Sequence, residues 1–328
     1  MLKDKIIQFF SQFESENIEN SFPLNYCLPV YHCVSDENLP HLNQIIKYKN
    51  IKQFESDLDY LSKYFQFVNW DEFKDFIKGN FKPKKKIALL TFDDGLSEFY
   101  DIIAPILERK GIYAINFINP AFIDNKDLMF RSKASLIVNK IKSGHIKNQE
   151  INPIFSSENH IEEILKIKYE NRIELDEIAE KLDISFDSFL QEQKPYLDLN
   201  QLKELTSKGF GISAHSWDHP LYHDLSLTQQ LETTQKTLNY LKENNLMTDS
   251  FAFPFTDFSV GKDFFEELFK NKNLFCTFGS AGIKTDNIER NFQRIPMETG
   301  ENAELILKKE ISYYKMKRFI NKNKIVRK

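Results

Sequence analysis

A short apolar run that ends in two carboxylates constrains this chain more than any other stretch. Residues 86–95 read KIALLTFDDG, and the apolar residues from Ile87 onward predict a strand that is buried on both faces, as in a parallel sheet. Asp93 and Asp94 at its end need partners, because buried carboxylates are rarely left without a cation or a hydrogen-bond donor. The pair therefore indicates a metal site or acid–base chemistry. An ordinary strand followed by an Asp-Gly turn is the plainer alternative.

A second strand-like run, about 120 residues further on, ends in histidines. Residues 209–220 read GFGISAHSWDHP, with His215 and His219 four positions apart. Neutral imidazole is a common zinc ligand, and two histidines this close can face one ion. With His223, three of the chain's 7 histidines fall in this region, although a surface or structural pair is the alternative. The two strand ends together offer carboxylates and imidazoles to one site.

These two segments resemble a known family. TFDDG at 91–95 followed by HSWDHP at 215–220 is similar to the first two motifs of the polysaccharide deacetylases, carbohydrate esterase family 4 with the NodB homology domain. Those motifs read TFDDG and H-[ST]-x-x-H, and both match at every specified position. The resemblance implies a distorted (β/α) barrel and a metal-dependent hydrolase that removes N-acetyl or other N-acyl groups from amino sugars in a polysaccharide, an oligosaccharide or a linked sugar precursor.

The resemblance also implies roles for the residues at the two strand ends. Asp94, His215 and His219 would hold a divalent metal, and Asp93 would be the catalytic base. Two imidazoles and one carboxylate leave open positions for water and substrate, which suits Zn²⁺, with Co²⁺ or Ni²⁺ as alternatives. Such an ion lowers the pKa of bound water from about 15.7 to near 7 and polarises the carbonyl.

Neighbours of the motif residues have weaker assignments. Thr91 is expected to orient the loop, or to be an ordinary β-branched strand residue. Ser216 and Asp218 are expected to hydrogen-bond to the ligating imidazoles. His223 is not expected to act directly.

The later motifs of the family are incomplete in this chain. Residues 251–255 (FAFPF) keep a Pro-aromatic pair but lack the arginine that braces the catalytic aspartate in many members. No histidine follows His223, so the Leu-x-His motif that supplies the general acid is absent. His32, which follows a first predicted strand, is the candidate substitute acid, with a structural histidine as the alternative. Arg294 and Arg131 are the candidates for the missing guanidinium.

The order of predicted elements favours an α/β fold, a distorted (β/α) barrel of about seven strands. Strands are predicted near 26–32, 67–68, 86–93, 112–118, 210–214, 251–255, 274–278 and 292–296, and helices over 52–65, 70–78, 98–110, 199–208, 227–243 and 261–270. Gly111 is expected to cap the third of these helices. Residues 124–200 break this order and predict a helical insertion between the two site-bearing strands, with helices over 131–143, 159–170 and 174–183. The insertion either covers the cleft as a lid or pads the scaffold.

The chain is expected to form one domain over 1–328, with distinct ends. Residues 1–24 are predicted to be an N-terminal segment with an amphipathic helix that places Phe9, Phe10 and Phe13 on one side. Residues 302–328 predict a basic helix and tail, and 308–328 hold nine basic residues and one acidic residue. This tail either contacts anionic lipid as a peripheral membrane element or frays in solvent.

Composition bounds the partners and the compartment. A formal charge of −4 gives no global attraction for nucleic acid, and 41% hydrophobic with 28% charged residues is typical of a soluble globular protein. Three cysteines, an odd number without a C-x-x-C pair, favour a reducing compartment. The N-terminus is a poor signal peptide, so a cytoplasmic location is expected. A carbohydrate-binding homologue with impaired catalysis and an amidohydrolase for a non-sugar amide are the competing functions.

Overall fold

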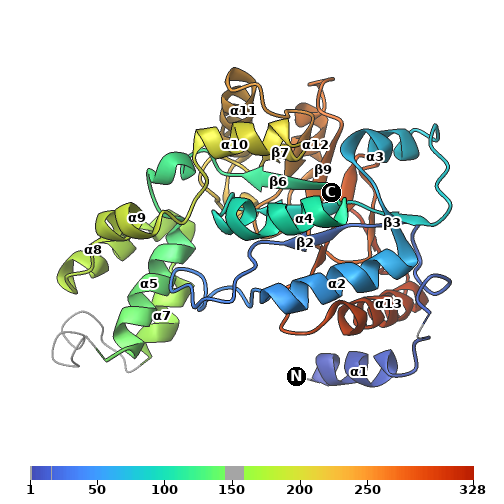
Figure 1. The fold of residues 1–328 in the computed structure, drawn as a ribbon, viewed down its shortest axis with the longest axis horizontal. Helices are drawn as coiled ribbons and strands as arrows, with labels where there is room; N and C mark the ends of the chain where they lie inside the picture. Colours follow the sequence, from blue (N-terminus) through green and yellow to red (C-terminus); the bar gives the residue numbers. More distant parts are fainter. Residues whose placement is uncertain (1, 16, 145–158) are drawn as a thin grey trace.

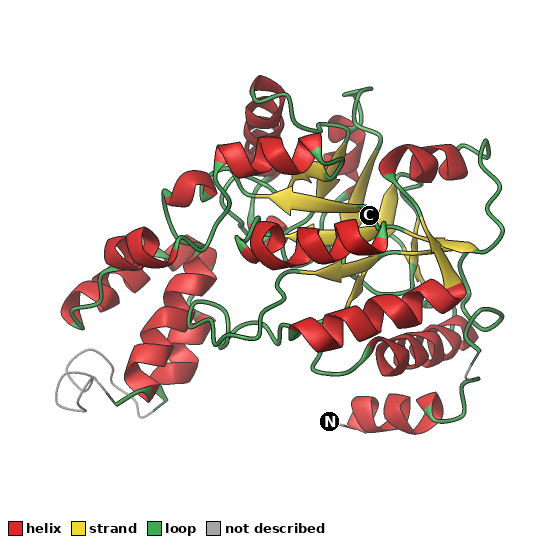
Figure 2. Cartoon of the chain, viewed as in Figure 1, coloured by secondary structure: helices red, strands yellow, loops and turns green. Residues whose placement is uncertain are grey.

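The structure is a computed structural model and describes residues 2–15, 17–144 and 159–328. Its centre is a sheet of eight parallel strands in the order β11-β9-β8-β7-β6-β5-β2-β12 (Figure 2). The strands are β2 (Pro29–Tyr31), β5 (Leu90–Asp93), β6 (Ala114–Ile118), β7 (Gly211–Ala214), β8 (Ser250–Ala252), β9 (Cys276–Gly279), β11 (Asn291–Gln293) and β12 (Ile295–Pro296). Parallel strands put all their carboxyl ends at one edge, so Asp93 and His215 meet there.

One short segment closes this sheet into a barrel. β11 pairs with β9 at one edge and β12 pairs with β2 at the other, and only Arg294 separates β11 from β12. The two edge strands are therefore one bent segment, and the barrel has seven strand positions. This confirms the predicted distorted (β/α) barrel of about seven strands, and it places Arg294 at the point of closure.

Two predicted strands are divided between sheets. The segment predicted over 26–32 splits at Leu28 into β1 (Tyr26–Cys27) and β2, and the Asp93 strand splits at Leu89 into β4 (Lys86–Ala88) and β5. β1 and β4 join β3 (Phe65–Phe67) in a three-stranded parallel sheet, whereas β2 and β5 enter the barrel. A further pair, β10 (Thr285–Asp286) and β13 (Lys324–Ile325), was not predicted because each strand has only two residues.

The helices surround the barrel and the insertion lies to one side (Figure 1). Capping boxes begin α2, α3, α10 and α11 at Asn50, Asn69, Asp198 and Ser226. Gly111 ends α4 with φ +64°, as predicted, but a π-helical turn over Phe99–Ile103 replaces the first part of the helix predicted over 98–110. The helices are α1 (Leu2–Ser11), α2 (Ile51–Tyr64), α3 (Trp70–Ile77), α4 (Ala104–Lys110), α5 (Phe130–Lys142), α7 (His160–Lys166), α8 (Ile173–Lys181), α9 (Phe186–Gln193), α10 (Leu199–Ser207), α11 (Leu227–Glu243), α12 (Lys262–Leu268) and α13 (Ala303–Phe319).

The insertion has an apolar core of its own. Buried residues of α5, α7, α8 and α9, among them Ile137, Ile164, Leu175 and Leu190, form a cluster separate from the main core. The β6 arrow in Figure 1 points toward the side on which these helices lie, so the insertion lies beyond the carboxyl ends of the strands. Helix α9 was missed, although Ser185 caps it. Whether the insertion acts as a lid remains a prediction.

Both ends of the chain differ from the expectation. The N-terminal helix ends at Ser11, earlier than predicted, and Phe9, Phe10 and Phe13, which were predicted to share one side of it, are exposed. The prediction of a fraying tail is wrong, because the segment after α13 adds β13 and buries Arg327. Within the described ranges, no helix has the length and apolar character needed to cross a membrane.

Candidate active site and metal centre

Three side chains from the two sequence motifs converge at the carboxyl end of the barrel. Asp94, His215 and His219 are buried, and one ligand atom from each lies within 4.8 Å of the other two. The Asp94 Oδ1 atom is 3.5 Å from His215 Nε2 and 3.2 Å from His219 Nε2. The structure thus brings together the predicted ligand set, although about 120 residues separate its two parts in the chain.

Hydrogen bonding engages Nδ1 of His215 and leaves Nε2 free to bind a metal. Its Nδ1 atom lies 2.9 Å from the carbonyl oxygen of Ala252, so Nδ1 carries the proton and donates it there. Burial is the main cause that lowers the pKa of His215 to about 4, so the imidazole is neutral at physiological pH. Its Nε2 lone pair therefore faces Asp94.

An unusual backbone conformation orients the carboxylate of Asp94 and the imidazole of His219. Asp94 and His219 have φ of +77° and +61°, a left-handed conformation that is uncommon outside glycine. Gly95 also has φ +67°, and a Cβ atom there would lie 3.1 Å from Cγ2 of Ile118. The Asp-Asp-Gly sequence therefore forms a tight turn that presents Asp94 beneath the imidazoles.

The donor set fits a divalent cation. Among the described residues, Asp94 Oδ1 and His215 Nε2 are buried atoms without a hydrogen-bond partner, an arrangement that is costly unless a bound group satisfies them. Burial alone would raise the pKa of Asp94, but His219, His32 and His215 hold it well below its ordinary value. An ionised carboxylate and two imidazoles match the ligand chemistry of a catalytic zinc site with open positions.

The neighbouring Asp93 is braced by Arg294. Nη1 and Nη2 of Arg294 donate to Oδ1 and Oδ2 of Asp93 at 2.7 and 2.8 Å, and both side chains are buried. Burial would raise the pKa of Asp93, but this guanidinium, assisted by His215 and His32, keeps it below its ordinary value. Arg294 therefore occupies the role of the guanidinium that is missing before Pro254. Arg131 does not, because it donates to the carbonyl of Leu165 in the insertion.

His32 lies at the mouth of the same site and is paired with Glu298. β12 runs parallel to β2 with Pro296 opposite Val30, and this register carries Glu298 to His32. The His32 Nδ1 to Glu298 Oε2 distance is 2.5 Å, and Glu298 Oε1 accepts from the backbone N–H of Cys33. Burial opposes protonation of His32, but Glu298 outweighs it and, with Asp94 and Asp93, raises the pKa of His32 to about 10. His32 is thus a protonated imidazole beside the two aspartates.

The remaining predicted residues have supporting positions. Thr91 Oγ1 donates to the carbonyl of Pro29 and lies 3.4 Å from Arg294 Nη1, so it orients the strand end. The expected hydrogen bonds from Ser216 and Asp218 to the imidazoles are absent among the described contacts. Ser216 Oγ accepts from the backbone N–H of His219, and Asp218 accepts from the hydroxyl of Tyr169. His223 pairs with Asp224 away from the metal ligands.

Sequence reasoning missed three contributors to the site. Asn119 is buried at the end of β6, and its amide donates to the backbone carbonyls of His215 and Ser216, which fixes the loop that carries His215 and His219. Glu298 carried no motif signal. Phe255 was noted only as part of a Pro-aromatic pair, but its ring packs edge-on against His219 with centroids 4.4 Å apart.

The comparisons with known proteins agree with this geometry. The family model described as polysaccharide deacetylase matches residues 80–163, which include the TFDDG motif. The deacetylase PplD of Streptococcus pyogenes, solved with acetate, is 16% identical and aligns over 87% of this chain and 97% of its own, with a TM-score of 0.56. IcaB from Ammonifex degensii is also 16% identical, and the alignment covers 87% of this chain and 97% of IcaB, with a TM-score of 0.54. A de-N-acetylase from Aggregatibacter actinomycetemcomitans is 15% identical, and the alignment covers 85% of this chain and 97% of that enzyme, with a TM-score of 0.53. Among curated proteins, no sequence matches.

The parallel barrel has the fold of these solved deacetylases, and the side chains at its carboxyl end match the ligand chemistry of a metal-dependent hydrolase. The resemblance predicted from the two motifs is confirmed. Residues 80–163 match the polysaccharide deacetylase family model, and the barrel as a whole has the fold of solved polysaccharide deacetylases.

Proposed function

We propose that this protein is a metal-dependent N-deacetylase that removes an acetyl or other acyl group from an amino sugar in a polysaccharide, an oligosaccharide or a linked sugar precursor. One observation carries the proposal: Asp94, His215 and His219 converge beside a second aspartate, Asp93, that a guanidinium braces. Zn²⁺ is the proposed ion, because the two imidazoles favour it over Mg²⁺ or Ca²⁺.

Asp93 has the properties of the base that takes a proton from the attacking water. A bound divalent ion would lower the pKa of that water and polarise the amide carbonyl. Arg294 holds Asp93 ionised and fixes its plane, yet each carboxylate oxygen retains a lone pair for a further proton. The Oδ2 atom lies 3.7 Å from His215 Nε2, which places it next to the metal ligands.

His32 has the properties of the acid that protonates the departing amine. Glu298 holds Nδ1 and maintains the positive charge, so Nε2–H is free to donate. The His32 side chain is 28% exposed, enough to meet a substrate that enters from solvent. Acid and base thus come from separate strands, β2 and β5.

The structure favours catalysis over a binding homologue that has lost activity. That alternative was based on the missing arginine and the missing C-terminal histidine. Arg294 and His32 place a guanidinium and an imidazole at the site from other parts of the chain.

The test is release of acetate from a panel of N-acetylated amino sugars and their oligomers. We expect the wild type to release acetate, chelator to abolish release, and Asp93→Asn to reduce it strongly. Asp187→Asn, at an exposed position on α9, is the matched control and should be unaffected. The proposal would be refuted if zinc-loaded wild type released no acetate from any substrate of the panel. Zinc binding, measured by calorimetry on metal-free protein, gives a readout that does not depend on turnover.

A further inference from the structure

The C-terminal segment returns to the catalytic end of the barrel. β13 pairs in parallel with β10, which follows β9, and the backbone N–H of Lys262 donates to the carbonyl of Lys328. The loops after β8 and β9 lie at the same end as Asp94, because the strands are parallel. The segment that was predicted to contact lipid or to fray is therefore part of the rim around the site.

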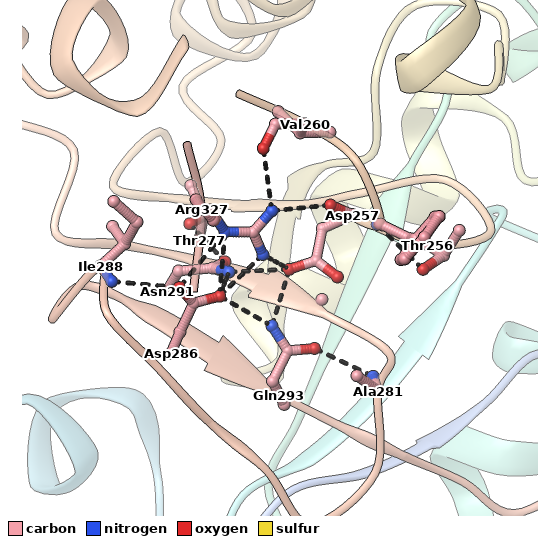
Figure 3. A network of polar contacts seen from close by, with 12 residues as sticks. Thr256, Asp257, Val260, Thr277, Ala281, Asp286, Ile288, Asn291, Gln293 and Arg327 are labelled. Atoms are coloured by element: carbon pink, nitrogen blue, oxygen red, sulfur yellow. Dashed lines mark hydrogen bonds and ion pairs between the residues drawn. The ribbon is translucent and has the colours of Figure 1, made fainter. Parts of the chain in front are cut away.

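A buried network anchors this segment through Arg327 (Figure 3). Its guanidinium donates to the carboxylates of Asp257 and Asp286 and to the carbonyls of Asp257 and Val260. The side-chain amides of Asn291 and Gln293 donate to the same Asp257 oxygen at 2.7 and 2.6 Å. The carboxylates of Asp257 and Asp286 are thus paired with Arg327 and do not pair with the lysines nearby.

Beside the network is a cavity of about 550 Å³ that is lined by lysines. We call it the tail pocket, and its walls are residues 256–261, Ala281, Lys284, Lys322 and 324–328. Among the described residues, no carboxylate pairs with Lys284, Lys322, Lys324 or Lys328, whereas Lys308, Lys309 and Lys315 on α13 each have an acidic partner. Lys322, Lys324 and Lys328 are exposed, and the ammonium group of Lys284 lies 5.9 Å from the centre of the Tyr313 ring. Four lysines along one cavity are a local concentration of positive charge in a chain of net charge −4.

The tail pocket begins next to the metal ligands. Phe255 packs against the ring of His219, and the following residue, Thr256, lines the pocket. The carbonyl of Phe255 accepts from Ser280 Oγ at 2.6 Å, and Ala281, adjacent to Ser280, also lines the pocket. The tail pocket and the candidate metal centre are thus joined by two short segments, 255–256 and 280–281, at the same end of the barrel.

We propose that the tail pocket binds a phosphate group that is linked to the amino sugar substrate. This inference rests on the proposed deacetylase function for the group at the metal centre. Lysine ammonium groups bind phosphate as point charges, and a phosphate monoester or a diphosphate carries up to about two negative charges, against one on a carboxylate. The arginine here is fully used in the network, and four lysines remain, so phosphate is favoured over carboxylate.

The first test measures pyrophosphate binding to chelator-treated protein by calorimetry, so that neither metal nor turnover contributes. We expect wild type to bind, and Lys322→Ala/Lys324→Ala to bind about tenfold more weakly or worse, because each lysine supplies a charged hydrogen bond. Lys52→Ala/Lys63→Ala, which removes two exposed lysines of α2, is the matched control and should bind as wild type. Equal affinity of wild type and Lys322→Ala/Lys324→Ala, or no binding by wild type, would overturn the proposal.

The second test compares three acetylated substrates on zinc-loaded protein: a neutral oligosaccharide, a nucleotide-diphosphate-linked amino sugar and a polyprenyl-diphosphate-linked amino sugar. We expect wild type to prefer one of the two phosphate-bearing substrates, which identifies the source of the phosphate. The preference should be lost in Lys322→Ala/Lys324→Ala, while its activity on the neutral oligosaccharide is unchanged. A preference for the neutral substrate in wild type would overturn the proposal. The binding test remains decisive even if no substrate is deacetylated.

Discussion

Replacement of Glu298 by glutamine tests the assignment of His32 as the general acid. The change keeps the shape of the side chain and an oxygen for the N–H of Cys33, but it removes the negative charge 2.5 Å from His32 Nδ1. Glu298 is the main group that raises the pKa of His32 to about 10, against the opposing effect of burial. Without this carboxylate the pKa should fall to its ordinary value of about 6.5 or below.

The size of the effect follows from the fraction of His32 that is protonated. At pH 8 nearly all of His32 is protonated in the wild type, whereas with a pKa of about 6.5 only about 3% is. We therefore expect kcat/KM at pH 8 to fall about 30-fold or more in Glu298→Gln, and only by a factor of about 1.3 at pH 6. The alkaline limb of the pH profile should move to lower pH by about 3.5 units.

The assay is kcat/KM for acetate release between pH 5.5 and 10, with zinc-loaded wild type, Glu298→Gln and His32→Gln. Glu289→Gln, at an exposed position, is the control and should follow the wild-type profile. The reasoning would be refuted if Glu298→Gln left the alkaline limb in place, or if His32→Gln kept wild-type activity at every pH.

Three further predictions concern the base, the metal ligands and the turn. Arg294→Gln should leave Asp93 buried without its partner and lower the free energy of unfolding by about 3–5 kcal/mol, measured by urea denaturation; an unchanged midpoint would contradict the buried pair. Zinc at 100 times its Kd should stabilise wild type by about 2.7 kcal/mol and His219→Ala much less, measured by thermal unfolding, and equal shifts would exclude His219 as a ligand. Gly95→Ala should lower the free energy of unfolding by about 1–2 kcal/mol, because Gly95 has a positive φ and a Cβ atom there would press on Ile118. If urea denaturation gave the same stability as wild type, the turn would not require glycine.

Local features of the site could be predicted from the sequence. An apolar run ending in Asp-Asp-Gly and a pair of histidines four apart define short segments whose conformation depends mainly on their own residues. These segments indicated a site with Asp93, Asp94 and the two histidines, and the family resemblance selected Asp94, His215 and His219 as the ligands. Parallel strands place the two loops at one edge of the sheet. The helices with capping boxes were also predicted closely, because a cap is a local interaction.

The expectation for the C-terminal tail shows the limit of this reasoning. Nine basic residues within 308–328 suggested a solvated or lipid-facing segment. Charge density alone could not show that Arg327 has two buried carboxylate partners, Asp257 and Asp286, up to 70 residues away in the chain. A cation in a sequence is normally expected in solvent unless its partner is known.

The sequence by itself indicated the candidate ligands Asp94, His215 and His219, the Asp-Gly turn and the alternation of strands and helices, because these depend on residues close together in the chain. Only the tertiary structure decided which guanidinium braces Asp93 and which carboxylate holds His32. Arg294 is 201 positions from Asp93, and Glu298 is 266 positions from His32. Both contacts exist because the segment 291–296 closes the barrel between β9 and β2, and no local pattern encodes the register in which two distant strands pair.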